Sequence, residues 1–171
     1  MKLYYVIGLL WLIPMQACRS NTNLQEKQGI IDMRWDPEQT KKELTISENG
    51  STLSWQNDSQ AIWLASQTTA RLKSGIFTWD FEIEELANRQ IGVGIMLDPP
   101  DWGFFRYLGA GKNAWAYDAY EGAIVTETEA IYSGLPKFTD NGTVSIRLDL
   151  LNEHKCVFSV NGVATPAINL P

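Results

Sequence analysis

The chain has 171 residues, 44% of them hydrophobic, so it is long enough to form one domain with a substantial core. Its formal net charge is −6 and its sequence has no cluster of Lys and Arg, which argues against recognition of nucleic acid or of an anionic membrane surface by charge. With only two cysteines, no disulfide framework is expected.

The N-terminal segment is typical of an export signal. An apolar run over residues 3–15 is too short to cross a bilayer comfortably as a helix, but fits the apolar part of a secretory signal. It ends at Ala17-Cys18, which resembles a bacterial lipobox, in which the cysteine is lipidated and becomes the new N-terminus. We therefore predict a signal peptide over residues 1–18, lipidation of Cys18 and attachment to the bacterial cell envelope. Ordinary cleavage after Ala17, giving a secreted protein, is the alternative.

Residues 19–30 are polar and predict a tether between the anchor and a domain that spans residues 31–171. Apolar residues recur with a period of two in Ile76–Glu84 and Thr143–Leu150, which indicates strands with one buried face. Ile91–Leu97 is apolar throughout and predicts a strand covered on both faces. Shorter strands are predicted at Leu44–Ser47, Thr52–Trp55, Ala61–Ala65, Ala114–Tyr117, Ala123–Thr126, Lys155–Val160 and Ala167–Leu170.

Turn signals separate these strands, among them Asn49-Gly50, Asn141-Gly142 and Asn161-Gly162. No segment beyond the signal has a helical period. The pattern predicts an all-β fold, an antiparallel two-sheet β-sandwich. Cys156 falls in a predicted strand and is expected to be buried and unreactive.

Five sequence segments occur in the order found in the SPRY (PRY-SPRY) family, and the chain resembles that family from about Met33 to Gly162. The opening resembles the PRY motif, and the later segments are similar to SPRY strands. The matching segments are Trp35-Asp36-Pro37 with Leu44–Gly50, Ser74–Ile83 around Trp79, Ile91–Ile95, Gly109–Asp118 around Trp115, and Val144–Leu150 with Val157–Gly162.

The resemblance implies a concanavalin A-like jelly roll that binds peptides or protein surfaces through loops at one end, without a shared cofactor. Trp79, Trp115 and Phe158 fall at strand positions where aromatic residues fill a core. The long loop Asp98–Gly111 is the candidate binding loop, since aromatic residues with an Arg are typical of interface hot spots. The candidate binding residues are Trp102, Phe104, Phe105, Arg106, Tyr107 and, after the next strand, Tyr120. Packing of the loop against the end of the core is the alternative.

Three groups of residues were weighed for catalysis or metal binding. Glu82 and Glu84 share one face of a predicted strand, as the two catalytic carboxylates of a glycosidase can. They also continue the alternation of polar residues that predicts a solvated strand face. Glu85 would lie on the opposite face. His154, the single histidine, falls in a predicted exposed turn. The third group, Asp98, Asp101, Asp118 and Asp140, lacks the spacing of a calcium loop and is typical of turns.

The sequence thus predicts a binding protein rather than an enzyme, with no metal or other cofactor. The expected partner is a protein or peptide, and the membrane is reached only through the lipid anchor. Two alternatives remain open. One is a lectin-like domain that binds glycans, with Trp102 stacking on a sugar ring. The other is a glycan-degrading enzyme on a similar sandwich.

Overall fold

The structure, a computed structural model, describes residues 4–11, 18–21, 33–55, 63–84, 91–97, 111, 113–118, 120–137 and 141–171. Within these residues the chain forms fourteen strands and one short 3-10 helix, η1 (Pro37–Gln39). Among them, no helix is long and apolar enough to span a membrane.

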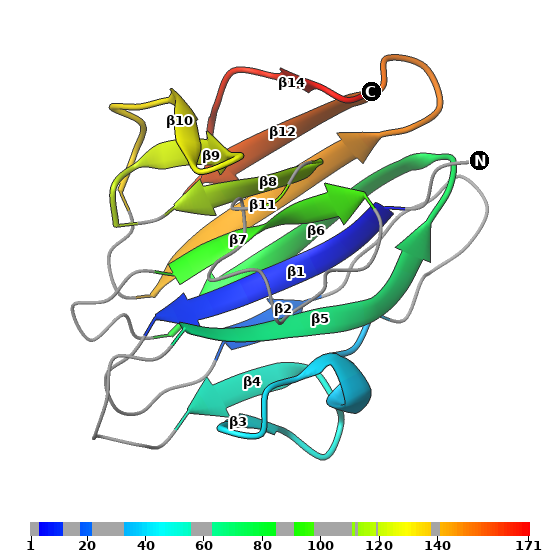
Figure 1. Cartoon of the computed structure of the whole chain (residues 1–171), viewed down its shortest axis with the longest axis vertical. Helices are drawn as coiled ribbons and strands as arrows, with labels where there is room; N and C mark the ends of the chain where they lie inside the picture. Colours follow the sequence, from blue (N-terminus) through cyan, green and yellow to red (C-terminus); the bar gives the residue numbers. More distant parts are fainter. Residues whose placement is uncertain are drawn as a thin grey trace.

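The strands form two antiparallel sheets that pack against each other (Figure 1). The first sheet has six strands in the order β10 (Glu129–Tyr132), β9 (Ala123–Thr126), β8 (Ala114–Asp118), β7 (Ile91–Leu97), β1 (Tyr4–Trp11) and β5 (Trp63–Leu72). The second has eight: β13 (Val163–Ala164), β12 (Lys155–Val160), β11 (Gly142–Asp149), β6 (Ile76–Ile83), β2 (Cys18–Asn21), β4 (Thr52–Trp55) and β3 (Leu44–Ile46), with β14 (Ile168–Asn169) also paired to β12. The predicted all-β antiparallel sandwich is confirmed.

The core lies between the sheets and is lined by the alternating apolar positions that the sequence predicted. On β6 these are Phe77, Trp79, Phe81 and Ile83, and β11 contributes Val144, Ile146 and Leu148; all are buried. Trp115 on β8 and Phe158 on β12 are also buried core residues, as expected. Cys156 is a buried free cysteine, and burial raises the pKa of its thiol. Its predicted location in the core is confirmed.

Strand β5 is longer than the predicted strand at Ala61–Ala65 and runs on to Leu72. The added residues include Ser66, Gln67 and Thr68, which are polar and yet fully buried. Polar residues in sequence favour a loop, and neighbouring segments account for their burial: β1 pairs with Ser66 and Gln67 on one side. The main chain of Arg34–Asp36 pairs with them: the N–H of Asp36 donates to the Gln67 carbonyl at 2.7 Å. Buried backbone groups are thereby satisfied.

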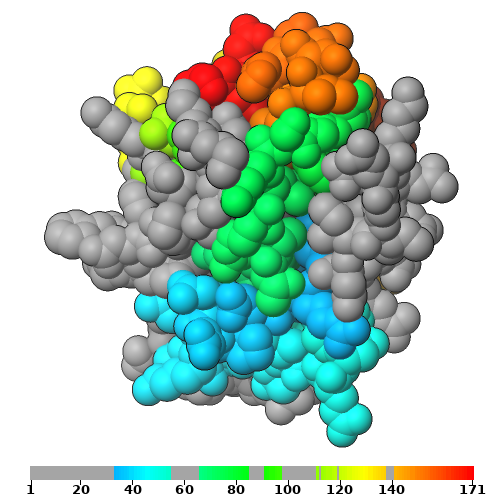
Figure 2. Space-filling model, turned by 90° about the vertical axis from the view of Figure 1, so that its right-hand side faces the viewer, coloured from blue at the N-terminus to red at the C-terminus, as the bar shows by residue number. Residues whose placement is uncertain are grey.

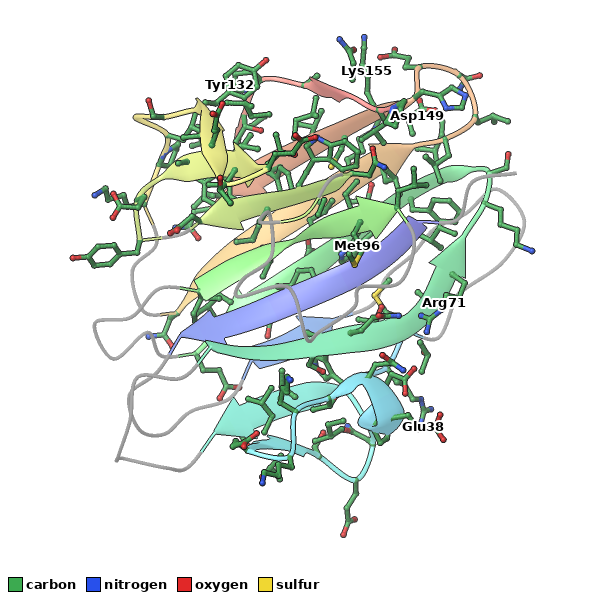
Figure 3. The ribbon with its side chains drawn as sticks, viewed as in Figure 1. Glu38, Arg71, Met96, Tyr132, Asp149 and Lys155 are labelled. Carbon is green, nitrogen blue, oxygen red and sulfur yellow. The ribbon has the colours of Figure 1, made fainter. Side chains whose placement is uncertain are left out.

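The segment after Met33 is fixed to β5 by side chains as well. Asp36 caps helix η1, because its Oδ1 accepts from the N–H of Glu38 at 3.0 Å. Its other oxygen, Oδ2, lies 3.4 Å from Nη2 of Arg71 on β5. Arg71 and the helix carrying Glu38 face each other at one edge of the sandwich (Figure 3). In the space-filling view, residues of this segment, in blue and cyan, form a continuous surface with the green residues of the following strands (Figure 2).

Gly94 lies where two strands approach closely. It pairs with Ala116 of β8, and a Cβ at this position would lie 2.0 Å from the carbonyl oxygen of Trp115. No rearrangement of a side chain relieves such a contact, since both partners are main chain.

Strands β1 and β2 come from the segments that the sequence assigns to the signal peptide and the start of the tether. Strand β1 lies inside the six-stranded sheet, antiparallel to both β5 and β7 (Figure 1). Strand β2 begins at Cys18, which pairs with Ile83 of β6 and Leu53 of β4. In the complete chain these residues therefore contribute main-chain pairing to both sheets.

Candidate binding surface

Of the predicted binding residues, one lies within the described part of the chain and the others lie outside it. Tyr120 belongs to the part of the chain that the structure describes, and it lies in the turn between β8 and β9. The candidates of the 98–111 loop lie outside the described residues: Trp102, Phe104, Phe105, Arg106 and Tyr107. The candidate surface comprises the β8–β9 turn with Tyr120, the edge strand β10, and residues 133–137, which lead from β10 back to that turn.

Asp118, the last residue of β8, holds the β8–β9 turn closed. Its Oδ1 accepts hydrogen bonds from the backbone N–H groups of Tyr120 and Glu121, at 3.0 and 3.1 Å. Gly122 has a φ of +64°, and a Cβ at this position would lie 2.3 Å from the carbonyl oxygen of Leu135, so glycine is required. Asp118 thus forms the hydrogen bonds of a turn, as its sequence context predicted.

At the end of β8, burial raises the pKa values of two neighbouring groups, the carboxyl of Asp118 and the phenol of Tyr117. Burial raises the pKa of Asp118, and the N–H groups of Glu121 and Tyr120 partly oppose this effect. Burial, together with the charge of Asp118, raises the pKa of Tyr117 to about 12. Tyr117 therefore remains protonated at neutral pH, and its hydroxyl donates a hydrogen bond to the carbonyl oxygen of Pro136. This bond fixes residues 135–137 against the sheet.

Lys137 in this fixed segment partners Tyr120. The N–H of Leu135 donates to the carbonyl of Gly122 at 2.9 Å, which brings the segment alongside the turn. The Lys137 Nζ then lies 5.7 Å from the centroid of the Tyr120 ring, within cation–π range. Tyr120 is nevertheless 51% exposed. The turn thus holds an exposed aromatic ring in a defined position, which lowers the conformational entropy that a binding partner must restrict.

Strand β10 adds further exposed apolar side chains. It ends the six-stranded sheet, where all four of its residues are exposed, including Ile131 at 41% and Tyr132 at 37% (Figure 3). The pairing with β9 shifts between Ala130 and Tyr132, so Ile131 is the extra residue of a β-bulge. Glu127 and Thr128 both have positive φ, as a two-residue hairpin turn requires.

The surface around these side chains is acidic. Residues 113–118 and 120–137 contain four acidic residues, Asp118, Glu121, Glu127 and Glu129, and one basic residue, Lys137. A partner segment that combines apolar or aromatic side chains with basic ones complements this surface.

The other residues weighed for catalysis do not assemble into a described site. Glu82 and Glu84 are half-buried near the end of β6, where Glu82 pairs with Thr143. His154 is exposed in the β11–β12 turn, as predicted. Within the described residues, no group of three or more His, Cys, Asp and Glu is arranged to hold a metal ion. Glu85, Asp98, Asp101 and Asp140 lie outside the described residues.

Sequence reasoning missed Lys137, Ile131 and Tyr132 as part of this surface. The Glu127-Thr128 turn lacks the Gly, Asn or Asp that usually marks a hairpin, and four residues are too few for a clear alternation. The one available signal was an apolar pair, Ile131-Tyr132, shortly after a predicted strand.

No protein-family model matches the chain, and no curated protein matches its sequence.

Proposed function

We propose that the chain is exported, anchored to the cell envelope through lipidated Cys18, and that its SPRY-like sandwich binds a protein or peptide partner through one end. The single observation that carries the binding proposal is Tyr120. Its ring is half-exposed, yet the turn beneath it is fixed by Asp118 and by Gly122, and Lys137 lies over the ring. Exposed aromatic residues with low conformational freedom are typical anchors of protein interfaces.

Two further features support this surface as the contact region. Ile131 and Tyr132 add exposed apolar area, while the acidic residues around them favour a partner with basic side chains. The family resemblance implies recognition through end loops, and the 98–111 loop is a second candidate of that kind. It connects the end of β7 to the start of β8, and these strand ends lie at the opposite end of the two strands from the Tyr120 turn. Trp102 and Arg106 of that loop are therefore included in the test.

The test begins with affinity capture from native membranes, using the domain without its anchor, followed by binding isotherms with the captured partner. Tyr120→Ala should weaken binding by about 2 kcal/mol, roughly 30-fold, the usual threshold of a hot spot. Trp102→Ala and Arg106→Ala test the other end, and a loss of similar size there would assign the contact to the 98–111 loop instead of the Tyr120 turn. The matched control for Tyr120 is Leu151→Ala, which removes an exposed side chain (59%) from the β11–β12 turn, at the end of the sandwich opposite the β8–β9 turn (Figure 1).

Melting curves on the same variants separate binding from folding. Tyr120→Ala should leave the melting temperature nearly unchanged, because the ring is exposed in the free domain. Unchanged affinity in the Tyr120, Trp102 and Arg106 variants would contradict the proposed surface. A glycan array distinguishes the lectin-like alternative, and loss of hydrolysis on replacing Glu82 and Glu84 would instead favour an enzyme.

The anchor is tested separately by phase partitioning. The wild-type protein should enter the detergent phase, and Cys18→Ser should move it to the aqueous phase, because the acyl chains supply the affinity for detergent. A wild-type protein that partitions into water would refute lipidation.

A further inference from the structure

Strand β1 has a central place in the sandwich, although it comes from the segment whose sequence predicts removal on export. It forms seven residue pairs with β7, from Tyr4↔Leu97 to Leu10↔Ile91, and seven with β5, ending at Trp11↔Trp63. A chain processed at Cys18 lacks all of these pairs. The position between β5 and β7, here named the β1 slot, then has an unpaired edge on each side.

Each wall of the β1 slot also has main-chain contacts that do not involve β1. Strand β7 stays paired to β8 through five residue pairs, from Gly92↔Asp118 to Met96↔Ala114. Strand β5 remains fixed to the segment around Asp36, through the main-chain bridge of Trp35 with Thr68 and the contact of Arg71 with Asp36. Removal of β1 therefore leaves β7 in its sheet with β8, whereas β5 is left without a paired strand among the described residues and keeps its main-chain contacts with residues 34–36 and the Arg71–Asp36 contact.

The β1 slot adjoins the hydrophobic core. On β7 the core residues Ile91, Val93, Ile95 and Leu97 are buried. No residue of β7 is charged, and the one charged residue of β5, Arg71, contacts Asp36. An open slot exposes both unpaired main-chain groups and apolar core, and each is costly to leave in water.

We propose that in the exported chain the β1 slot accepts an extended, uncharged apolar strand donated by a partner protein, antiparallel to both β5 and β7. This inference rests on the proposed cleavage before Cys18. The chemistry of the donor follows from the segment that occupies the slot in the complete chain, Tyr4–Trp11, which has eight residues, no charge and one glycine. Strand addition of this kind obtains its affinity from main-chain hydrogen bonds and its selectivity from alternate side chains.

A second copy of the chain is a poor donor. Each copy processed at Cys18 has lost the same residues 4–11, so neither has that strand to donate. The anchor at Cys18 also holds the slot close to the membrane, which favours a donor that is itself exported or membrane-bound.

The experiment compares two forms of the full-length gene product, purified from membranes and cells. The wild type should be processed, and mass spectrometry of its N-terminal peptide should find Cys18 first. Cys18→Ser should block lipidation and the cleavage that depends on it, so this variant retains residues 4–11 and serves as the filled control. The probe is a synthetic peptide with the sequence of Tyr4–Trp11 and two lysines added for solubility.

The peptide should bind the processed form saturably, raise its melting temperature and slow amide hydrogen exchange in β7. It should not bind the Cys18→Ser form. A peptide with proline at the position of Ile7 should bind about tenfold more weakly or worse, because proline removes an N–H from a strand paired on both sides. Hydrogen exchange of the processed form without peptide gives a second measure: amides of β7 that face the slot should exchange faster than in the Cys18→Ser form.

Two results would overturn the inference. If the processed form does not bind the peptide and its β7 amides are already protected, another segment of the same chain fills the slot. If the wild-type N-terminus is Met1, the proposed export is wrong as well, and β1 is a permanent strand of the sandwich. Loss of binding at Tyr120 is measured independently, so the end-loop surface and the β1 slot succeed or fail separately.

Discussion

Truncation of Trp79 measures how much the aromatic centre of the core contributes to stability. Trp79 lies in the middle of β6, is 1% exposed and pairs with the buried Ile146 of β11. Deleting a fully buried Trp side chain costs about 3–5 kcal/mol, through lost apolar burial and the cavity left behind. In a domain of this size, that loss should lower the melting temperature by roughly 10 °C.

The indole N–H of Trp79 refines this expectation. Its Nε1 is buried without a hydrogen-bond partner among the described residues, and an unpaired buried donor costs about 1–3 kcal/mol. Trp79→Phe removes that donor while keeping most of the apolar ring. The phenylalanine variant should therefore lose only about 1–2 kcal/mol, well under the loss in the alanine variant.

Urea denaturation followed by circular dichroism compares the two variants with the wild type. Thr78→Ala is the matched control, since Thr78 is the exposed neighbour on the same strand and its loss should change stability by less than about 0.5 kcal/mol. A loss below about 1 kcal/mol in Trp79→Ala would refute the core position of this residue. Equal losses in the alanine and phenylalanine variants would show that the indole N–H is hydrogen-bonded after all.

Three further predictions concern single residues. Gly94→Ala should destabilise the fold by about 2 kcal/mol or more in the same urea assay, because the new Cβ overlaps the carbonyl of Trp115 on β8; wild-type stability would contradict the close approach. Asp149→Ala should cost about 2 kcal/mol at neutral pH, since its Oδ1 accepts N–H groups of the β11–β12 turn. The hydrogen bond from the N–H of Asn152 is the largest cause that lowers the pKa of Asp149. The negative charge of Asp149 therefore stabilises the fold above the unfolded pKa of about 3.9, and this stabilisation is lost as the pH falls through the lower folded pKa. Asp149→Asn should lack that acid-side loss in stability measured against pH, and a slope equal to that of the wild type would refute the assignment. Cys156 should react with a thiol reagent only after unfolding, because burial raises the pKa of its thiol; rapid labelling of the native protein would place it at the surface.

The strands with a clear period of two were predictable because each has one face in the core. Alternation in Ile76–Glu84 identified β6, which ends one residue earlier at Ile83, and the apolar run Ile91–Leu97 identified β7 with its observed ends. Turn residues behaved in the same way, since Gly50 and Gly162 adopt the positive φ that their Asn-Gly pairs indicated. These features are local, and a local pattern is readable without knowledge of its neighbours.

The candidate surface was predictable only in part. Tyr120 was selected from its position after a strand, but its partner Lys137 is 17 residues away, and their contact depends on the hydrogen bond between Leu135 and Gly122. Strand β10 was missed, since it is short, exposed on both faces and preceded by a turn without glycine. Solvent on both sides removes the alternation that marks a strand in the sequence.

By itself, the sequence determined that the chain is a β-sandwich, which aromatic residues fill its core and where most of its turns lie. The tertiary structure decided which segments, distant in the sequence, lie side by side. It buried Ser66, Gln67 and Thr68 next to the segment of Arg34–Asp36, and it paired residues 4–11 with two distant strands. The physical reason is that strand pairing joins main-chain groups, which every residue carries, so the choice of partner depends on the register and burial of the whole sheet rather than on the residues of one strand.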